Sequence, residues 1–335
     1  MEATRSGGRC VELVGEGAPD AAMRMAERPA PEAAPGTVAI RVRAAGVAFA
    51  DVKMRHGIYP GAPPFPFVPG YDVAGEVVAG AGFAPGERVA ALTFTGGYAE
   101  HVAVDARRVA RMPARMPAGA GFADATACVL NYVTAWQMIE RVARVPDGAT
   151  ILVHGGGGGA GTALLDLARR RGLRAFATAS AGKHDLVRRY GGLPIDYRAA
   201  DFVPVLRDAG GADAVFDHVG GGHLLRSAQA AKRGGTVVGY GFAGGVSDRA
   251  VVRDTYAAFA RLLLRPGLRA RFYGILSPPF SQRRHIQGDL ERVLALLGAG
   301  AITPHVGARL PLDRAAEAHA MLEAGQSEGK IVLEP

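Results

Sequence analysis

The chain has 335 residues, enough for two domains that each bury a core of their own. Its 49% hydrophobic and 21% charged residues exclude a disordered or fibrous protein. No apolar run reaches the roughly 18 residues that a membrane helix needs, and the opening MEATRSGGRC lacks the apolar stretch of a secretory signal. With only Cys10 and Cys128, a disulfide framework and a four-thiolate zinc site are both excluded, so we expect a cytoplasmic protein.

The formal net charge is +8, from 39 basic and 31 acidic residues. Such a balance raises the question of nucleic-acid binding, since cationic patches attract phosphate backbones. The arginines are scattered, however, and the run Arg169-Arg170-Arg171 ends an amphipathic helix, where cations suit the helix dipole. We therefore expect no nucleic-acid partner, because an anionic small ligand explains the basic balance equally well.

The first 120 or so residues read as short strands divided by glycine and proline. The segment 59–70 (YPGAPPFPFVPG) holds five prolines and predicts a loop of restricted shape. The strands predicted here span residues 38–42, 71–78, 87–92 and 98–104.

From residue 124 strands and helices alternate, and the strands are almost continuously apolar. This pattern predicts a parallel sheet covered on both faces, hence an α/β fold. The predicted strands span 151–154, 175–178, 194–198, 214–217 and 236–240, and the predicted helices 163–171 and 184–190. From about residue 302 the chain returns to a strand, a helix over 314–322 and a final strand over 330–333.

The most informative segment is the glycine run from His154 to Gly161. A glycine run by itself is usually a flexible linker. Here a strand leads into it and an amphipathic helix leaves it, and Gly156, Gly158 and Gly161 fit the pattern G-x-G-x-x-G. The first glycine permits a tight turn, the second lets the backbone approach a pyrophosphate, and the third lets helix and strand pack closely. The backbone N–H groups of Gly159 and Ala160 then open a helix that favours an anion, which predicts a dinucleotide site.

The next strand indicates which dinucleotide binds. An NAD site usually places Asp or Glu about 20 residues on, to hold the ribose 2′-hydroxyl. This chain has no carboxylate there, whereas Ser180 offers a hydrogen bond and Lys183 a charge for a 2′-phosphate. Tyr197 and Arg198, which end the next predicted strand, are placed to close around the same phosphate. The alternative is a solvated surface lysine and a turn serine; on balance we expect NADPH.

At this point the chain resembles the medium-chain dehydrogenase/reductase superfamily, and within it the zinc-free quinone oxidoreductase-like branch. The segments that carry the resemblance occur in the family's order along nearly the whole chain. They are GVAFADVKMRHGIYP, FVPGYDVAGEV, LNYVTAWQM, HGGGGGAG, the set Ser180, Lys183 and Tyr197, and GKIVL.

The resemblance implies a Rossmann domain, with a doubly wound parallel sheet, and a GroES-like, mostly β catalytic domain made of both chain ends. We expect the GroES-like domain at 1–123 and 286–335 and the NADP-binding Rossmann domain at 124–285. The family also implies NADPH as hydride donor, an active site between the domains, and frequent homodimers.

Zinc is excluded on chemical grounds, because a catalytic site needs about three Cys, His or carboxylate ligands. Zinc-dependent relatives place a Cys near Ala48 and a His where this chain has Tyr71-Asp72. A lone His56 or His101 is more often a packed or surface residue than a ligand. Asp51 and Asp72 likewise have a plain reading as hydrogen bonders at a turn or strand end, so we expect no metal.

Without a metal, alcohol–aldehyde interconversion loses its usual Lewis acid. Hydride addition to a conjugated quinone or enone remains accessible, since a hydroxyl or amide stabilises the charge that develops on oxygen. By resemblance the candidate donors are Tyr59, Asn131 and Thr134, with Thr134 close to the nicotinamide. Tyr59 is equally a packed loop aromatic.

Two departures from the family concern the same region. Relatives commonly carry Asn at the position of Ala48 and Tyr at the position of Lys53. Lys53 is a candidate to attract an acidic substrate or stabilise an enolate, or else it is a surface lysine.

Several further residues are assigned with less support from the sequence. Gly220 and Gly241 sit at strand ends where a bound cofactor needs close backbone approach. Asp217 and His218 end a strand, which favours packing or capping over catalysis. Tyr273 is placed near the carboxamide by family analogy, and Lys330 faces either the cofactor cleft or solvent.

The sequence thus predicts an NADPH-dependent, zinc-independent oxidoreductase that transfers hydride to a quinone or an α,β-unsaturated carbonyl or enoyl compound. The alternative is an NADPH-binding protein with little turnover that acts through regulated association.

Overall fold

The computed structural model describes residues 7–245, 247–276 and 280–335. Their contacts divide the chain into a discontinuous unit, Met1–Val133 with Arg284–Pro335, and a continuous unit, Thr134–Arg283. The boundaries expected from the sequence follow residues 123 and 285. The first lies ten residues before the division in the structure and the second two residues after it, and both stay predictions. The two-domain α/β fold expected from the sequence is confirmed.

In its described part the continuous unit contains a six-stranded sheet in which every pair is parallel. The sheet order is β10-β9-β8-β11-β12-β13. The order reverses between β8 and β11, which is the Rossmann arrangement, and ligands of such sheets bind outside the carboxyl ends of the strands at this reversal. The strands are β8 (Thr150–His154), β9 (Arg174–Ala179), β10 (Leu193–Asp196), β11 (Ala212–Asp217), β12 (Ala231–Gly239) and β13 (Arg269–Phe272).

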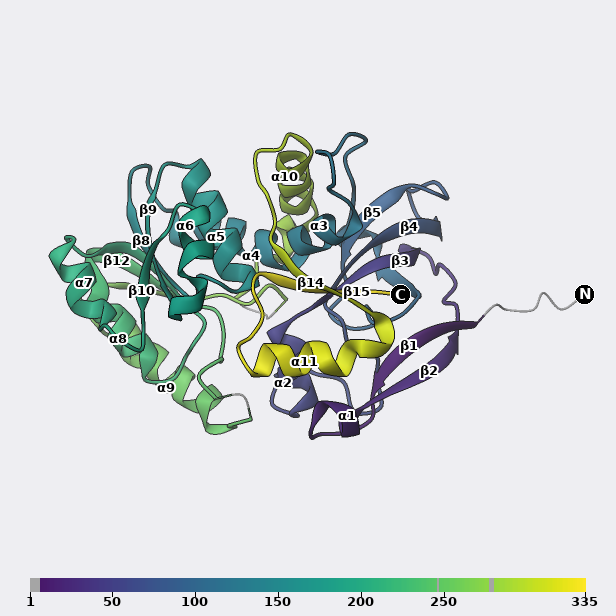
Figure 1. Cartoon of the computed structure of the whole chain (residues 1–335), viewed down its shortest axis with the longest axis horizontal. Helices are drawn as coiled ribbons and strands as arrows, with labels where there is room; N and C mark the ends of the chain where they lie inside the picture. The colour runs from purple at the N-terminus through teal and green to yellow at the C-terminus, as the bar shows by residue number, and fades with distance from the viewer. Residues whose placement is uncertain (1–6, 246, 277–279) are drawn as a thin grey trace, which may run out of the picture. The chain divides into compact units, whose positions relative to one another are not determined.

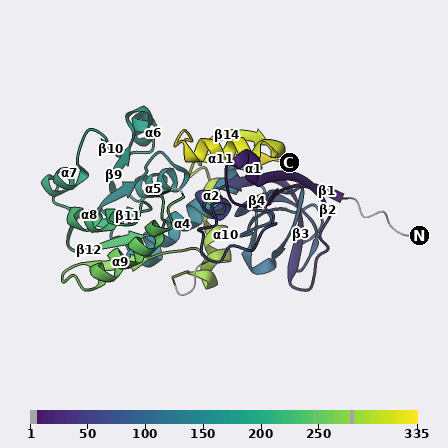
Figure 2. The same ribbon diagram turned by 90° about the horizontal axis from the view of Figure 1, so that it is seen from below.

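Apolar side chains cover this sheet because parallel strands are buried on both faces. On one face Leu152, Val215 and Val237 pack with residues of α7 (Phe202–Asp208), α8 (His223–Ala230) and α9 (Ala250–Leu263). Helix α8 packs on β12 and against α9, and α9 packs on β13 (Figure 2). Helices α5 (Gly159–Arg170) and α6 (His184–Arg189) pack against β8, β9 and β10.

The discontinuous unit contains a mostly antiparallel sheet with the path β14-β15-β3-β4-β5-β7, and β6 also pairs with β3. Strands from the two chain ends meet here, since β15 pairs with β3 through Ile331 and Val47 (Figure 1). The strands are β3 (Thr37–Val47), β4 (Asp72–Gly80), β5 (Arg88–Leu92), β6 (His101–Asp105), β7 (Val109–Arg111), β14 (Val306–Pro311) and β15 (Lys330–Glu334); β1 (Gly7–Leu13) and β2 (Met23–Pro29) form a separate hairpin.

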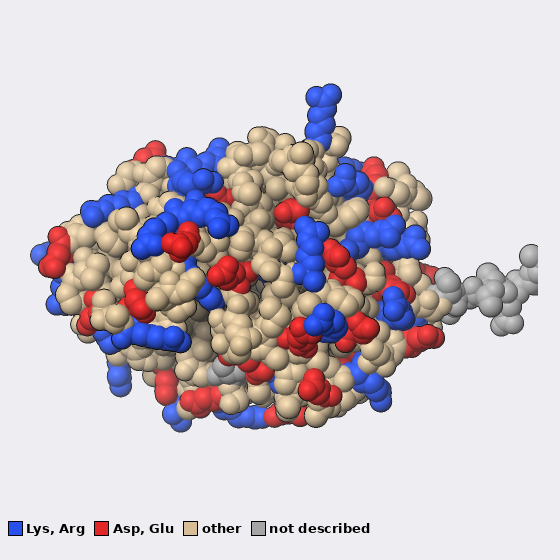
Figure 3. All heavy atoms as spheres, viewed as in Figure 1, with Lys and Arg blue, Asp and Glu red and all other residues tan. Residues whose placement is uncertain are grey.

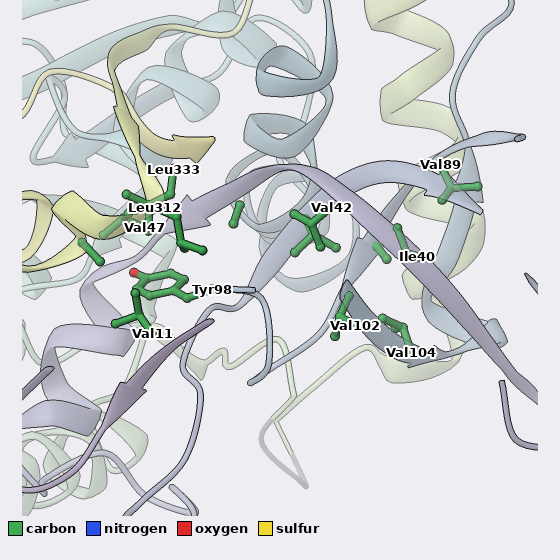
Figure 4. Packing of buried hydrophobic residues seen from close by; sticks show 14 of the residues in the cluster. Val11, Ile40, Val42, Val47, Val89, Tyr98, Val102, Val104, Leu312 and Leu333 are labelled. Atoms are coloured by element: carbon green, nitrogen blue, oxygen red, sulfur yellow. The ribbon is translucent and has the colours of Figure 1, made fainter. Parts of the chain in front are cut away.

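The core of this unit is aliphatic and joins residues from both ends of the sequence. Val42 and Val47 of β3, Leu312 and Leu333 are all buried in one cluster with the ring of Tyr98 (Figure 4). Helix α11 (Ala315–Glu323) adds Ala315 and Ala318 to the same cluster, which is how the C-terminal segment completes a domain begun at the N-terminus.

The predicted strands are present with shifted ends, but several helical features differ from the expectation. The N-terminal region is not strands alone: Phe49–Arg55 forms helix α2, whose first turn is closed by the Asp51 carboxylate. The helix running through α3 (Phe122–Ala127) and α4 (Val133–Trp136) contains two π-helical stretches, Cys128–Tyr132 and Gln137–Ala143. Helices α7, α8, α9 and α10 (Ile286–Gly298) were not predicted from the sequence, nor were strands β1, β2, β7 and β13.

Two findings concern membranes and nucleic acids. None of the helices in the described part of the chain is both long and apolar enough to cross a bilayer. On the face in Figure 3, Lys and Arg side chains are interspersed with Asp and Glu, as the scatter of arginines along the sequence predicts.

Candidate active site

The glycine run forms a turn between β8 and α5, and its glycines differ in backbone angle and in the space around them. Gly155 adopts φ +69°, so the tight turn is made at Gly155 and not at Gly156 as expected. A Cβ at Gly156 would lie 2.6 Å from the Cβ of Ala177, and one at Gly161 would overlap the carbonyl oxygen of Gly155. A Cβ at Gly158 would meet no atom closer than 3.5 Å. The loop therefore packs tightly on its sheet side and leaves room at Gly158, the residue that precedes helix α5.

Hydrogen bonds hold this loop to the neighbouring strand. The N–H of Gly156 donates to the carbonyl of Thr178 at 2.9 Å, and the N–H of Gly158 donates to the carbonyl of Gly155 at 3.0 Å. The first N–H groups of α5 have no intrahelical acceptor, and together with the helix dipole they favour an anion. The geometry fits the pyrophosphate of a dinucleotide.

The residues expected at a 2′-phosphate follow the ends of two neighbouring strands, and their role there stays a prediction. Asp196 of β10 pairs with Ala179 of β9, so Tyr197 and Ser180 leave the sheet at the same level. A Cβ at Gly157 would lie 2.6 Å from the Cδ of Lys183, which places the lysine stem against the glycine loop. Tyr197 is 54% exposed, and the guanidinium of Arg198 lies 5.6 Å from its ring centre.

Beyond the strand-order reversal, the loops after β11 and β12 touch each other. Gly220 adopts φ +78°, and a Cβ there would lie 3.0 Å from the carbonyl oxygen of Gly241. A Cβ at Gly241 would in turn lie 2.8 Å from the carbonyl oxygen of His218, so both glycines are needed for the packing of these loops, and their role at a cofactor stays a prediction. Tyr273, which follows β13, is fully buried and donates its hydroxyl to Oε1 of Gln137 at 2.9 Å.

A buried hydrogen-bond network lies beneath this site, and the sequence did not reveal it. The Asp217 carboxylate accepts hydrogen bonds from Ser227 at 2.6 Å and from His223 Nδ1 at 2.8 Å. Its other oxygen accepts from the N–H groups of Val219 and Gly220, so the predicted capping role of Asp217 is confirmed. Burial alone would raise the pKa of Asp217, but the bonds from His223 and Ser227 outweigh it and hold this pKa below its usual value.

The same network reaches the glycine loop through His154. Its ring nitrogens lie 3.1 Å from the hydroxyls of Thr178 and Ser227, and Gly155 donates its N–H to Thr178 Oγ1. Burial lowers the pKa of His154 to about 3, so this imidazole is neutral at physiological pH. Since Thr178 bonds both the loop and His154, the network fixes the loop from below.

His154, Asp217 and His223 are also the one group of the described residues whose ligand atoms lie within 4.8 Å of one another, close enough to consider a metal. The Ser227 hydroxyl stands among them and bonds two of the three. All three side chains are thus engaged in hydrogen bonds of the network, which accounts for the cluster as a structural one.

In the discontinuous unit two of the expected catalytic residues, Lys53 and Tyr59, lie on α2 and in the loop that follows it. Asp51 closes the first turn of α2 and accepts the N–H of Ala48 at 2.9 Å and of Gly70 at 3.1 Å. Burial raises the pKa of Asp51 to about 7 although both N–H groups oppose this. Lys53 is 4% exposed, so it is not the surface lysine of the alternative reading, and its ammonium lies 5.5 Å from the Phe49 ring centre.

Tyr59, in the proline-rich loop, is half-buried and its Oη lies 2.8 Å from the Oη of Tyr71. By the resemblance, zinc-dependent relatives place a histidine where this chain has Tyr71-Asp72 and a cysteine near Ala48. A phenol and a methyl group are not zinc ligands. This position therefore offers phenolic hydroxyls in place of a metal site.

Lys330, expected at the cofactor or in solvent, is 2% exposed and forms an ion pair with Asp72. The two groups are 2.7 Å apart at closest, and a Cβ at Gly46 would overlap both side chains. Burial raises the pKa of Asp72, and the Lys330 ammonium and the N–H of Leu130 oppose this. The pair thus connects β15, β4 and the π-helical stretch that contains Asn131.

Asn131 and Thr134 lie three residues apart on one continuous helical segment, 9% and 8% exposed. π-helical stretches such as Cys128–Tyr132 occur frequently at functional sites. This irregularity is not signalled in the sequence, since the segment has no proline or glycine.

Comparison with known proteins agrees with this geometry. Residues 34–114 match the family described as alcohol dehydrogenase GroES-like domain, and residues 192–333 the one described as zinc-binding dehydrogenase. The chain is 32% identical to the human (Homo sapiens) synaptic vesicle membrane protein VAT-1 homolog, over 98% of this chain and 86% of that protein. It is 29% identical to a probable quinone oxidoreductase of Schizosaccharomyces pombe, over 94% of each chain.

Among solved structures, a mycobacterial protein complexed with NADPH superposes with a TM-score of 0.84 at 28% identity, covering 98% of this chain and all of that one. The glycine loop, the paired strand ends at Ser180 and Tyr197, and the phenols in place of zinc ligands fit one branch of one superfamily. The chain belongs to the medium-chain dehydrogenase/reductase superfamily, in its zinc-free quinone oxidoreductase-like branch, whose cofactor NADPH fits the glycine cradle described above.

Proposed function

We propose that this oxidoreductase uses NADPH to reduce a conjugated carbonyl compound without a metal, a quinone in the first place and an α,β-unsaturated carbonyl or enoyl compound in the second. The observation that carries the proposal is the hydroxyl of Tyr59, half-buried and 2.8 Å from Tyr71 Oη, at a position built of phenols. The likeness to a probable quinone oxidoreductase supports the choice of acceptor.

The reaction needs an acid at the acceptor oxygen. When bound, NADPH supplies a hydride to the electron-poor carbon, and negative charge then develops on the carbonyl oxygen. The Tyr59 hydroxyl stabilises that charge and donates its proton to the oxygen. Asn131 and Thr134 are proposed as further hydrogen-bond donors, and the buried ammonium of Lys53 as a positive charge that favours an enolate.

The continuous unit holds the cofactor in this proposal. Gly158, Gly159, Ala160 and the first turn of α5 receive the pyrophosphate, and the loops at Gly220 and Gly241 admit the rest of the dinucleotide. Ser180, Lys183, Tyr197 and Arg198 bind the 2′-phosphate. The side chain of Tyr273 is hydrogen-bonded to Gln137, so Tyr273 is proposed to contact the cofactor through its backbone. The side chain of Lys330 is paired with Asp72, so Lys330 is proposed to act on the site only through Asp72.

The test is the oxidation of NADPH, followed by its absorbance, with benzoquinone, naphthoquinone, cyclohexenone and a crotonyl thioester as acceptors. We expect quinone turnover well above the rate without enzyme, unchanged by a strong chelator, and kcat at least about tenfold lower in Tyr59→Phe because the acid is gone. Turnover that a chelator abolishes, or a Tyr59→Phe variant as active as the parent, contradicts the proposal.

The second candidate, an NADPH-binding protein with little turnover, is separated by the same experiment. It predicts saturable binding of NADPH, measured by the fluorescence of the nicotinamide, and no acceptor that speeds NADPH oxidation. The tightly packed glycine loop supports either protein equally, whereas the placement of Tyr59 favours the enzyme.

We also propose a homodimer in the cytoplasm. Strand β13 lies at the end of the sheet order, and an edge strand is a ready site for pairing with a second copy. Cys10 and Cys128 are both buried and neither forms a disulfide, as suits a reducing compartment. Light scattering of the purified protein gives the mass: that of two chains supports the dimer and that of one chain contradicts it.

A further inference from the structure

Three aromatic rings from separate segments of the discontinuous unit meet around the Tyr59 hydroxyl. Tyr71 precedes β4 and Phe94 follows β5, and their rings stand edge to face with centres 5.3 Å apart. The ring of Tyr59 lies 6.2 Å from that of Tyr71 and 6.3 Å from that of Phe94. The Tyr59–Tyr71 pair is also edge to face, whereas the Tyr59–Phe94 pair is tilted, and the hydroxyl oxygens of Tyr59 and Tyr71 lie 2.8 Å apart within this packing.

The backbone at Phe94 is held in a strained conformation by hydrogen bonds of its neighbours. Phe94 adopts φ +81°, a left-handed conformation that is unfavourable for a bulky residue. The N–H of Thr93 donates to the carbonyl of Tyr71 at 2.9 Å, and Thr93 Oγ1 donates to the carbonyl of Gly70 at 2.6 Å. Strained residues of this kind persist where surrounding bonds over-determine them, often at functional sites. The N–H of Phe94 itself also donates to the carbonyl of Tyr71, at 3.4 Å, so the backbones of Phe94 and Tyr71 are linked directly.

The two hydroxyls differ in access. Tyr71 is 2% exposed, whereas Tyr59 is half-buried. A phenol donates only one proton, so when Tyr59 donates to an acceptor outside the pair, the bond within the pair must run from Tyr71 Oη–H to Tyr59 Oη. Tyr59 is then the residue that meets a substrate, and Tyr71 the residue behind it.

We propose that Tyr71 is a positioning residue for Tyr59: its hydroxyl donates a hydrogen bond to Tyr59 Oη, orients it, and stabilises the phenolate left when Tyr59 gives up its proton. The inference rests on the proposed function, in which that proton goes to the acceptor oxygen. The O–H bond of Tyr59 breaks, an O–H bond forms on the reduced acceptor, and solvent returns a proton to Tyr59 afterwards. Tyr71 keeps its own proton throughout.

The test is Tyr71→Phe, which removes the hydroxyl and keeps the ring that packs on Phe94. A hydrogen bond to a charged group corresponds to a change of about ten- to a hundredfold, so we expect kcat to fall by at least about tenfold with little change in KM for NADPH. We also expect the alkaline limb of the pH–rate profile to move up by about one pH unit or more, because the phenolate of Tyr59 has lost its donor. In the Tyr59→Phe background, Tyr71→Phe should add little.

The matched control is Tyr190→Phe, which removes a buried tyrosine hydroxyl from the continuous unit. It should leave the pH–rate profile in place whatever it does to the melting temperature. If Tyr71→Phe behaves like this control, or lowers the rate without moving the alkaline limb, the positioning role is refuted while the proposed function stands.

A second readout does not need activity. Alkaline titration of tyrosine absorbance should show one ionisation that is missing in Tyr59→Phe and moved to higher pH in Tyr71→Phe. If the parent protein oxidises no NADPH with any acceptor, the proposed function fails, and this titration still decides whether Tyr71 acts on Tyr59. An ionisation of Tyr59 that Tyr71→Phe leaves in place overturns the inference.

Discussion

The two units build their sites by different means. In the continuous unit the site is backbone: a turn at Gly155, a close contact at Gly161 and the open start of α5, all within one short segment. In the discontinuous unit it is side chains brought together from far apart in the sequence. Asp72 and Lys330 are 258 residues apart, and Tyr98 and His319 are 221 apart.

The buried polar groups differ between the units as well. Around Asp217 all hydrogen bonds converge on one ionised carboxylate beside a neutral His154. In the discontinuous unit Tyr98 links Asp51, whose pKa is raised by burial to about 7, with His319, whose pKa burial lowers to about 3. The site in the continuous unit therefore depends on the absence of side chains in the glycine loop. The site in the discontinuous unit depends on buried polar groups that pair with each other. A substitution can disrupt either one without the other.

The largest effect is expected from Lys330→Met, which leaves Asp72 buried without its cation. Breaking a buried ion pair from one side costs about 3–5 kcal/mol, so the free energy of unfolding, measured by urea denaturation, should fall by that amount. Replacing both partners, as Asp72→Asn with Lys330→Met, should recover part of the loss.

The control is Lys232→Met, whose ammonium pairs with Asp213 at the surface of the continuous unit. There the expected loss is at most about 1 kcal/mol. Equal losses at Lys330 and Lys232 would show that pairing is no more important in the discontinuous unit than elsewhere.

The next largest effect is expected from a comparison of alanine substitutions at two glycines of the same loop. In Gly161→Ala the new methyl overlaps the Gly155 carbonyl, so we expect about 1–3 kcal/mol of destabilisation together with weaker NADPH binding. In Gly158→Ala the methyl has room, and the melting temperature should stay while NADPH binding weakens if the pyrophosphate lies there. Calorimetry of unfolding and of NADPH binding measures both; a stable Gly161→Ala would refute the packing argument.

Acid should weaken the continuous unit first. The pKa of His154 is lowered in the fold to about 3, so the unfolded chain takes up its proton first, and stability is lost as pH falls below 6.5. At pH 5 this amounts to about 2 kcal/mol.

His319 acts in the same direction in the discontinuous unit, but Asp51 opposes it. Because the folded pKa of Asp51 is about 7, above its unfolded value, stability is gained as pH falls from 7 toward 4. Hydrogen exchange at pH 7 and pH 5 should therefore show greater loss of protection in β8 and β11 than in β3 and β4. The opposite order would contradict the assignment.

The smallest effect is one of selectivity. Lys183→Ala should weaken NADPH binding about tenfold, roughly 1.4 kcal/mol, and spare NADH, because the ammonium is proposed to meet only the 2′-phosphate. Arg188→Ala, an exposed residue paired with Asp185, is the control and should change neither affinity. Equal losses for both nucleotides would place Lys183 elsewhere in the site.

Local pattern predicted much of the fold. Strand–helix alternation after residue 124 predicted the parallel sheet, and the glycine run between β8 and α5 predicted a dinucleotide turn, because both depend on neighbours in the sequence. Helix α2 was missed, since a short helix between proline-rich segments has little periodicity. The assignment of the turn to Gly156 was wrong by one residue, because consecutive glycines are equivalent until a backbone angle distinguishes them.

The sequence by itself determined the alternation of elements, the phosphate-binding turn, the superfamily and the absence of zinc-ligand residue types at Ala48 and Tyr71. Tertiary structure alone decided that Lys330 pairs with Asp72, that Asp217 anchors His223 and Ser227, and that the hydroxyls of Tyr59 and Tyr71 meet. The physical reason is the sequence separation of the interacting residues. Backbone turns depend on residues adjacent in the sequence. A buried charge or hydroxyl instead pairs with whichever partner the folded chain brings within about 3 Å.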